Sequence, residues 1–299
     1  MKDSHQIKKR TNKPALPPID ALPALSMGLR GCAPEQWLDG PDAFGDQDMK
    51  ARQLGKKQIL LSARPEDVFA CLAAGRTAAE EATSRIAAHL RRYNKVSVRA
   101  ADAASLQAIS GLIPEDILIL TQSEQTDEEP DWLLSAAVLC FPSHWRLSEK
   151  IGQSVTAIHD PVPGFAERLA QPVNRFFTTM KPGPITQRMN WSIQTGDQLH
   201  TPERLPARPQ DRTAEEWGAH IHIRTERQCF YKLPETGAVV FTIRTSLAPL
   251  NRFRAQPEFV QMVLEQARTL SPAFQAYKAI AETDAGMKAW IDKYLPCKT

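Results

Sequence analysis

The sequence has few cysteines, and none of them belongs to a Cys-x-x-Cys motif. The five cysteines are Cys32, Cys71, Cys140, Cys229 and Cys297. This wide spacing argues against a zinc or iron–sulfur site built from cysteine. An odd number of separated cysteines suits free thiols in a reducing compartment, so we predict a cytoplasmic protein.

Long apolar runs are also missing, because no segment reaches the roughly 18 residues that a membrane span needs. Residues 1–14 are basic and polar, without the apolar stretch of a signal peptide. The chain has no excess of one charge, since 37 basic residues face 34 acidic ones for a net charge of +3. This balance gives no indication of a nucleic-acid or membrane partner.

Several catalytic motifs are absent from the sequence. It contains no G-x-S-x-G, no H-E-x-x-H, no phosphate-binding loop and no G-x-G-x-x-G. The pair His220 and His222 is weak evidence for a metal site, because no partner motif accompanies it. The serine hydrolase, zinc enzyme and nucleotide-fold classes therefore lose support.

What the chain does have is length and an ordinary composition. Its 299 residues, 42% hydrophobic and 24% charged, are typical of a soluble globular protein. They can bury a core large enough to enclose a cofactor. We divide the chain into a disordered arm at 1–23, which is basic and rich in proline, and one domain at 24–299.

Apolar periodicity predicts helices on either side of a group of strands. The expected helices are 65–74, 77–93, 257–269 and 271–294. Segments 117–120 and 133–141 are expected to form a hairpin around an acidic turn at 124–131. We expect the segment 25–61 to be irregular.

Strict alternation predicts three longer strands, at 185–193, 221–231 and 239–247. The last two are joined by a short turn, so the three are expected to form an antiparallel meander. A long linker at 194–217 separates the first strand from the second.

The three strands carry polar residues at alternate positions. We expect Arg188 with Asn190, Arg224 with Glu226, and Arg244 to lie side by side on one surface of the sheet. Arginine suits bidentate binding of carboxylates, including propionates, and a glutamate among arginines could hold a cationic amine. A solvated sheet face laced with ion pairs would give the same pattern.

One histidine, His159, lies on a stiff turn framed by Pro161 and Pro163, just before a helical pattern. The apolar stripe from Phe165 to Met180 keeps its phase through a proline at 172, which predicts a kinked helix. A neutral imidazole there could ligate haem iron. Taken alone, such a histidine is more often a structural residue bonded to nearby backbone.

Six separated motifs resemble the haem-dependent oxidative N-demethylase family, alpha-subunit type. They are Phe-Pro-Ser-x-Trp at 141–145, Glu-Lys-x-Gly at 149–152, Ile-His-x-Pro-Val-Pro-Gly at 158–164, Arg-x-Asn-Trp at 188–191, Arg-x-Glu-Arg-Gln at 224–228 and Phe-Thr-Ile-Arg-Thr at 241–245. Met-Gly-Leu at 27–29 and Trp-Leu at 37–38 also fit. The resemblance runs from about residue 25 to the last helices.

This resemblance implies an α+β fold, with a PAS-like antiparallel sheet, flanking helices and additional helical elements at both ends. It implies haem b as cofactor, and oxidative demethylation of a small methylated amine such as dimethylamine with O2. Electrons would come from reductase partners bearing flavin and a [2Fe–2S] cluster, and a tetrahydrofolate-binding subunit could take up the formaldehyde. A haem-binding PAS gas sensor, or a haem-binding module without turnover, is the alternative.

Carried onto these positions, the resemblance makes His159 the proximal iron ligand, with His144 as the second choice. Arg188 and Arg244 become candidates for the haem propionates. Asn190, Arg224 and Glu226 become candidates for the catalytic pocket, where donors would stabilise the negative charge that dioxygen gains and an acid would orient the ammonium substrate.

Overall fold

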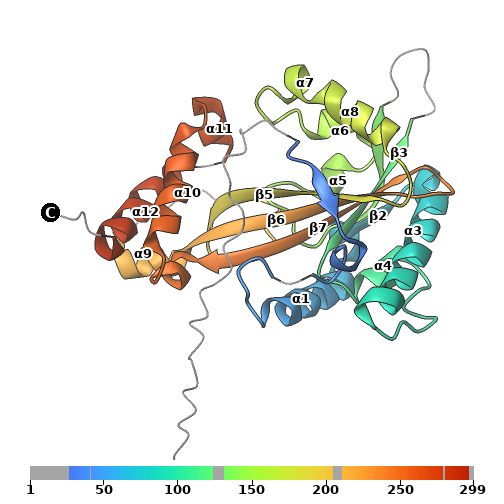
Figure 1. The fold of residues 1–299 in the computed structure, drawn as a ribbon, viewed down its shortest axis with the longest axis horizontal. Coiled ribbons are helices and arrows are strands. Elements are labelled where there is room, and N and C mark those ends of the chain that lie inside the picture. Colours follow the sequence, from blue (N-terminus) through green and yellow to red (C-terminus); the bar gives the residue numbers. More distant parts are fainter. Residues whose placement is uncertain (1–26, 41, 124–130, 205–210, 279, 296–299) are drawn as a thin grey trace, which may run out of the picture.

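The computed structural model of the chain describes residues 27–40, 42–123, 131–204, 211–278 and 280–295. The arm expected at 1–23 lies outside these residues. Within them, seven strands form one sheet in the order β1-β5-β6-β7-β3-β4-β2, and every neighbouring pair is antiparallel (Figure 1). The strands are β1 Arg30–Cys32, β2 Phe69–Cys71, β3 Asp116–Gln122, β4 Trp132–Val138, β5 Ile185–Thr195, β6 Ile221–Lys232 and β7 Val239–Pro249.

The long strands β5, β6 and β7 form the centre of the sheet and confirm the predicted meander. β6 pairs with β5 from Ile221 to Tyr231 and with β7 from His222 to Lys232. In the β6–β7 turn, Gly237 has a φ of +68°, a backbone conformation that glycine adopts without steric cost. The alternating sequence and the short turn together account for this part of the fold.

The predicted hairpin is also present, as β3 paired with β4. β3 pairs on its other side with β7, so the hairpin extends the meander into a wider sheet. The register shifts between Ile119 and Leu120, which is a bulge in this pair.

Several elements differ from the prediction. The helix expected at 65–74 forms only at Pro65–Val68 (α2), because the residues after it pair with β4 as strand β2. Helix α4 (Leu106–Ser110) was not expected, and α9 (Ala214–His220) begins inside the linker expected at 194–217.

The edge strands β1 and β2 have only three residues each, too few to show alternation. Helix α1 (Met49–Ala63) lies in the segment that we expected to be irregular. Its buried positions, Met49, Gln53, Lys57 and Leu60, follow helical spacing, but two of the four are polar and hide the stripe.

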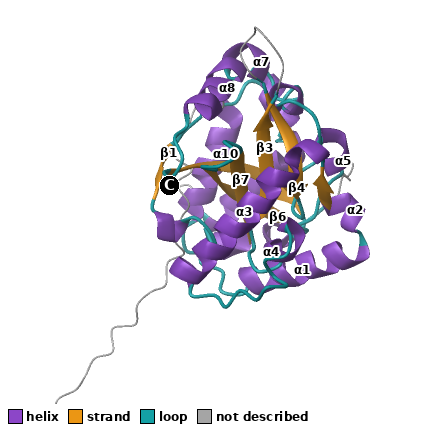
Figure 2. Ribbon diagram, turned by 90° about the vertical axis from the view of Figure 1, so that its right-hand side faces the viewer, coloured by secondary structure: helices purple, strands orange, loops and turns teal. Residues whose placement is uncertain are grey.

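Helices cover both faces of the sheet. The helices are α1, α2 Pro65–Val68, α3 Arg76–His89, α4 Leu106–Ser110, α5 Leu147–Lys150, α6 Val155–Ile158, α7 Phe165–Arg168, α8 Ala170–Thr179, α9 Ala214–His220, α10 Pro257–Thr269, α11 Pro272–Tyr277 and α12 Ala281–Tyr294. Figures 1 and 2 show α6, α7 and α8 over one face, and α1, α3 and α4 over the other. α9, α10, α11 and α12 gather at one end of the long strands (Figure 1).

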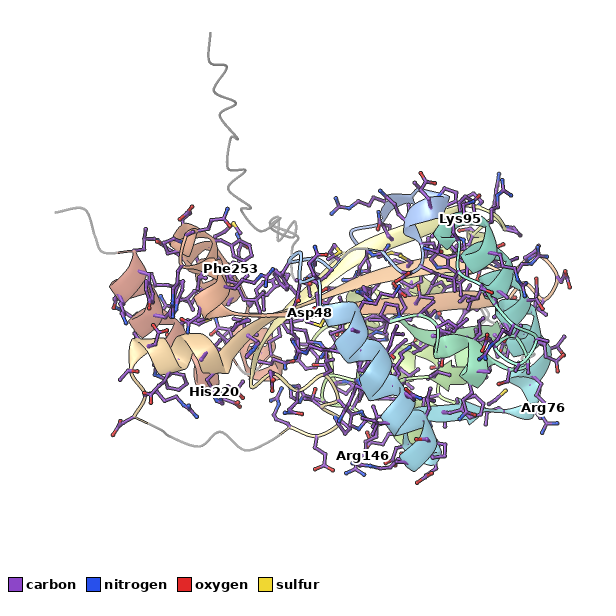
Figure 3. The ribbon with its side chains drawn as sticks, turned by 90° about the horizontal axis from the view of Figure 1, so that it is seen from below. Asp48, Arg76, Lys95, Arg146, His220 and Phe253 are labelled. Atoms are coloured by element: carbon purple, nitrogen blue, oxygen red, sulfur yellow. The ribbon has the colours of Figure 1, made fainter. Side chains whose placement is uncertain are left out.

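Each layer has its own apolar core. Phe165 and Phe177 from the α6–α8 layer pack with Phe230 of β6. On the opposite face, Leu60 of α1 and Ile86 of α3 belong to the core that contains Cys229 and Val240. Seen from below, α1 runs across the sheet from the point marked by Asp48, while Arg76 and Lys95 mark the far end (Figure 3). The fold is therefore α+β, with an antiparallel sheet between helical layers.

The expected kinked helix is interrupted at Leu169, and forms α7 and α8 instead of one helix. Pro172 has no N–H to donate to the carbonyl of Arg168, so the helix loses one bond at this point. The bond from Val173 N to Leu169 O still spans the joint at 2.9 Å. The helix expected at 271–294 is likewise two helices, α11 and α12.

Helix α3 ends in a single π-helical segment, Leu90–Asn94. No helix among the described residues is both long enough and apolar enough to cross a membrane.

Candidate functional site

The register of β5 and β6 places the predicted polar residues beside one another. Asn190 of β5 is opposite Glu226 of β6, and Arg188 is opposite Gln228. Opposed residues in an antiparallel pair point to the same side of the sheet, so these four and Arg224, two residues before Glu226, share one face. We call this face, which the α6–α8 layer partly covers, the Glu226 face.

Arg244 does not lie on the Glu226 face, and the prediction that it would is wrong. The β6–β7 turn pairs Lys232 with Val239, so even-numbered residues of β6 are opposite odd-numbered residues of β7. Arg244 is therefore opposite Arg227, on the side that α1 covers. Alternation within a strand shows which residues share a face, but only the turn decides which faces meet.

Glu226 is held by three side chains. Arg224 Nε donates to its Oε1 at 3.0 Å, while Gln228 Nε2 and Asn190 Nδ2 donate to its Oε2 at 3.1 and 3.4 Å. Burial alone would raise the pKa of Glu226, but Arg224 and these hydrogen bonds outweigh it and hold the pKa below its usual value. The carboxylate is therefore charged at neutral pH, and its side chain keeps 15% of its surface exposed.

Arg224 is fixed from behind by the main chain. Its side chain is 1% exposed, and its Nη2 donates to the carbonyl oxygen of Phe141 at 2.7 Å. The amides of Cys140 and Phe141 in turn donate to the carboxylate of Asp116 at 2.9 and 2.8 Å. Asp116 lies 3.7 Å from the ammonium nitrogen of Lys57, and both side chains are buried. A connected polar chain thus runs from α1 through the sheet to Glu226.

Sequence reasoning did not select Asp116 or Lys57. One signal was present, because Asp116 opens a strand that is otherwise apolar, Asp-Ile-Leu-Ile-Leu. A buried charge at such a position needs a partner, and here the partners are backbone amides and a lysine.

Arg188 has donors without protein partners. Its Nε is buried and makes no hydrogen bond to any described residue. Burial lowers the pKa of Arg188, and the nearby Glu226 carboxylate opposes that effect. A half-buried guanidinium with free N–H groups is suited to receive a carboxylate from a ligand.

His159 lies on the α6–α8 side, at the C-terminal end of α6. Ser154 starts that helix, its hydroxyl accepting from Ala157 N at 3.1 Å. His159 Nδ1 is 2.8 Å from the carbonyl oxygen of Val155, so Nδ1 carries the proton and Nε2 keeps its lone pair. The ring stacks on Phe165, with centroids 4.3 Å apart and an 11° angle between planes.

The environment of His159 keeps the imidazole neutral. Burial lowers its pKa, the bond to Val155 opposes this, and the positive charges of Arg188 and Lys150 add to the lowering. A neutral imidazole whose Nδ1 is held by a backbone carbonyl is the form that binds iron. The two interpretations of His159 are thus compatible, because its Nδ1 is structural while its Nε2 stays available.

Aromatic rings line the sheet beside the polar residues. Phe230 and Phe241 stack with centroids 4.7 Å apart and planes 3° apart, and Phe176 meets Phe230 edge-on at 5.7 Å. Together with Phe165 they give an apolar wall next to Arg188 and His159. Such a wall suits a flat, mostly apolar ligand with charged groups at its edge.

His144 lies elsewhere. It is exposed, has a φ of +62°, and its Nδ1 is 3.3 Å from the carbonyl oxygen of Glu203. The charges that it feels are those of Arg204, Glu282 and Arg224, the last of which lies on the Glu226 face. His144 makes no ring contact with the aromatic wall among the described residues, whereas His159 stacks on Phe165.

Two residues at the end of α11 complete the Glu226 face, and sequence reasoning missed both. Lys278 Nζ donates to the carbonyl oxygen of Trp191 at 2.7 Å and lies 5.2 Å from the centre of its ring. Burial lowers the pKa of Lys278 to about 8, against the effect of Glu226. Tyr277 also feels the charge of Glu226. Helical spacing predicts Tyr277 as an inward residue, but it is 41% exposed, and no pattern marks Lys278 because it lies at a helix end.

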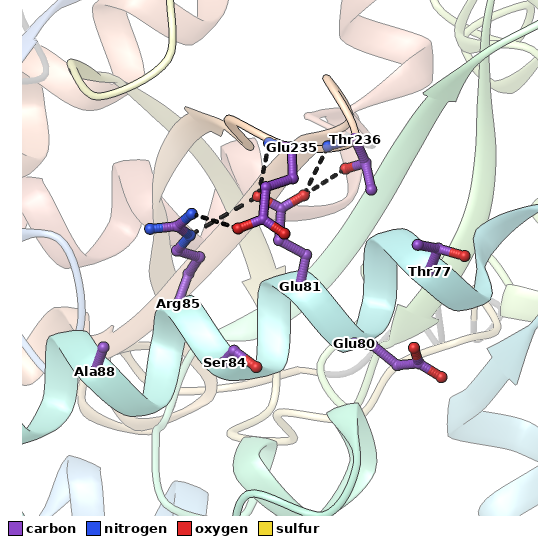
Figure 4. A pocket seen from close by; sticks show the side chains of 8 residues that line it. All are labelled: Thr77, Glu80, Glu81, Ser84, Arg85, Ala88, Glu235 and Thr236. Atoms are coloured by element: carbon purple, nitrogen blue, oxygen red, sulfur yellow. Dashed lines mark hydrogen bonds and ion pairs between the residues drawn. The ribbon is translucent and has the colours of Figure 1, made fainter.

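A surface hollow lies far from these residues, between α3 and the β6–β7 turn (Figure 4). Glu81 accepts from the amides of Glu235 and Thr236 at 3.0 and 2.8 Å, and Arg85 contacts both Glu81 and Glu235. The polar groups there bond to one another, so the hollow has the character of a structural contact.

A family model described as haem-dependent oxidative N-demethylase, alpha subunit-like, matches residues 91–287, which are 197 of the 299 residues. The match contains His159, Arg188, Asn190, Arg224 and Glu226, and extends beyond Lys278. Haem dependence is part of this description, and His159 offers a neutral imidazole beside an apolar wall. The chain belongs to the haem-dependent oxidative N-demethylase, alpha subunit-like family.

Proposed function

We propose that this chain is the haem-bearing subunit of a system that oxidatively demethylates a small methylated amine. One observation supports the proposal above the others. A neutral histidine with a free Nε2 and a charged, partly exposed glutamate lie on the same side of the sheet, with Arg188 close enough to influence the pKa of the histidine and itself influenced by Glu226.

The residues present fit a haem. His159 Nε2 would bind the iron, the phenylalanine wall would contact the macrocycle, and Arg188 would donate to a propionate. The buried Arg188 Nε that lacks a protein partner supports the last assignment. We assign haem b, which is held without covalent attachment, because the sequence has no Cys-x-x-Cys-His motif.

The topology supports a PAS-like domain. Five neighbouring strands lie side by side in the order β4-β3-β7-β6-β5. When these five are numbered along the chain, their order in the sheet is 2-1-5-4-3. Helices α5 to α8 are inserted between its second and third strands. This is the arrangement we expect of a PAS-like fold that encloses a ligand between its sheet and those helices.

The chain's own residues would bind and orient the amine. Haem, when bound, supplies the iron centre at which dioxygen is reduced. Glu226 would bind the substrate ammonium, because its carboxylate is charged and still partly exposed. Arg224 holds Glu226 in place, and Asn190 fixes its second oxygen. We give Arg244 no part in this pocket, since it lies on the other face, and we prefer His159 to His144 as iron ligand because its ring contacts the phenylalanine wall.

The family description names an alpha subunit, which indicates a system of several components. We propose that a reductase with flavin and a [2Fe–2S] cluster supplies the electrons, and that a tetrahydrofolate-binding subunit takes up formaldehyde. The cytoplasmic location expected from the cysteines stays a prediction.

An optical spectrum of the purified, haem-reconstituted protein tests the proposal. We expect a Soret band that shifts on addition of dimethylamine, and formaldehyde release when a reductant and O2 are supplied. His159→Ala should lose or shift the band, whereas the matched variant His144→Ala should keep it. A protein that takes up no haem would contradict the proposal, and oxygen binding with no response to amines would instead support a gas sensor.

A further inference from the structure

Lys278, directly after α11, places a positive charge near Glu226. Its ammonium donates to Trp191 O at 2.7 Å, and Trp191 is the strand neighbour of Asn190, which itself contacts Glu226. An ammonium has three N–H donors, so this bond leaves two for other groups. The side chain is half-buried, and its charge is therefore only partly screened by water.

No carboxylate among the described residues lies within 4.0 Å of the Lys278 ammonium. Glu226 is nevertheless close enough for its charge to raise the pKa of Lys278 against the lowering by burial. Glu226 has its ion pair with Arg224, at 3.0 Å, and not with Lys278. If Arg188 serves a haem propionate, Lys278 is left near Glu226 as a cation with no carboxylate of the described residues within 4.0 Å. A half-buried ammonium gains most from an anion that replaces the water it has lost.

Lys232 is packed in the same way as Lys278, so packing alone does not distinguish the two lysines. Lys232 also donates to a main-chain carbonyl at 2.7 Å, that of Phe177, and lies 4.7 Å from the centre of the Trp132 ring. Its pKa is lowered by burial alone, with no acidic group contributing. Both lysines cover an indole, but Lys278 alone of the two lies beside the glutamate proposed to bind substrate.

We propose that the substrate is a methylated amine that also carries a carboxylate, an N-methyl amino acid, with its ammonium at Glu226 and its carboxylate at Lys278. The inference rests on the proposed function. Glu226 and Lys278 form no direct ion pair, so the two opposite charges remain available to the two ends of a small zwitterion.

The reaction would be that of the proposed function, with the carboxylate unchanged. The bond between nitrogen and the methyl carbon breaks. One atom of dioxygen leaves in formaldehyde and the other in water. Two electrons and two protons enter from the reductase partner, and the product is the primary amino acid.

The test is a calorimetric titration of the haem-loaded protein with three probes: sarcosine, its neutral amide and dimethylamine. Sarcosine and its amide have nearly the same shape and differ in charge. A charge-assisted hydrogen bond at Lys278 should make sarcosine bind on the order of ten- to a hundredfold more tightly than the amide. Formaldehyde release from each probe is measured in parallel.

The variants assign that difference to a residue. Lys278→Met should abolish the preference for sarcosine over the amide, and Lys278→Arg should keep much of the preference. Lys232→Met is the matched control and should retain the preference. Glu226→Gln should weaken all three probes.

Two failures are distinguishable. Haem-loaded protein that demethylates dimethylamine but binds sarcosine no more tightly than the amide overturns this inference and leaves the proposed function intact. Protein that takes up no haem overturns the proposed function. The comparison of sarcosine with its amide uses the wild-type protein, so it decides the question even if Lys278→Met does not fold.

Discussion

The two faces of the central strands carry the same residue types in different settings. On the Glu226 face, Arg224 and Glu226 bond to each other, and two amide side chains complete the shell of the carboxylate. On the α1 side, Arg227 donates to the carbonyl oxygens of Gln36 and Trp37, and Glu115 accepts from the amide of Asp39.

The difference lies in what the charged groups hold. Arg227 and Glu115 bind main-chain groups from separate segments, and their side chains are 16% and 1% exposed, so they join parts of the chain. Glu226 is held by side chains alone, and its side chain keeps 15% of its surface exposed. Arg227 and Glu115 thus tie segments of the chain together, whereas the carboxylate of Glu226 takes all its hydrogen bonds from neighbouring side chains of the sheet.

The largest expected effect is on the α1 side. Arg227→Met leaves Glu115 buried without its partner, so we expect the free energy of unfolding to fall by roughly 3–5 kcal/mol. Denaturant titration measures this change. Arg99→Met breaks only an exposed ion pair and should leave stability unchanged. Equal stability of the two variants would remove the distinction between the faces.

Acid should also weaken the α1 side more than the Glu226 face. His89 is 7% exposed between Trp37 and Tyr93, and burial lowers its pKa from 6.5 to about 4. Below pH 6.5, His89 therefore binds a proton in the unfolded chain but stays neutral in the folded chain. Stability is full above pH 6.5 and falls by roughly 3 kcal/mol as pH drops to about 4.

Unfolding measured between pH 7 and pH 4 would reveal this loss. His89→Phe keeps an aromatic ring between Trp37 and Tyr93 and should show a smaller loss over the same range. A variant with the same pH profile as wild type would show that His89 is not its source.

The next effect concerns activity on the Glu226 face. Glu226→Gln keeps the shape but loses the charge that binds ammonium, so kcat/KM for an amine should fall about 100-fold, or roughly 2.7 kcal/mol. Glu115→Gln is the control on the opposite face, and should lower stability while leaving kcat/KM per folded molecule nearly unchanged. Loss of activity in both variants would show that the faces are not separable.

The smallest expected effect compares two arginines. Arg188→Met removes a propionate donor and should weaken haem binding about tenfold, or roughly 1.4 kcal/mol. Arg244 is 3% exposed, with Nε and Nη1 lacking partners among the described residues. Arg244→Met should leave haem affinity unchanged and stability within about 1 kcal/mol, because it removes a buried charge that has no close partner. Haem titration with thermal melting tests both variants.

Long elements with a regular apolar pattern could be predicted from the sequence. Elements of three residues, or with polar residues on their buried face, could not. The strands at 185–193, 221–231 and 239–247 alternate over enough residues to identify them, and β5, β6 and β7 confirm them. Helix α1 was not predicted. Its residues Gln53 and Lys57 are buried because they donate to main-chain carbonyls, and apolar periodicity does not reveal buried polar residues.

The site was predictable in part for a similar reason. Arg188, Asn190, Arg224 and Glu226 follow from alternation on adjacent strands, and the structure brings them together. The placement of Arg244 failed because it depends on how the turn pairs two strands. Asp116 and Lys278 reach the site from a different strand and a helix end, so no local pattern connects them with it.

The Glu81 contact in Figure 4 has a consequence for chemistry at the other end of the strands. Glu81 and the amides of Glu235 and Thr236 pin the tip of the β6–β7 hairpin to α3. A one-residue slip of β7 would turn each of its side chains over, bringing Arg244 toward Glu226 and moving Thr245 away. By holding the turn, Glu81 of α3 helps to fix the register of β7 against β6. This register keeps Arg244 away from the place where an amine is proposed to bind.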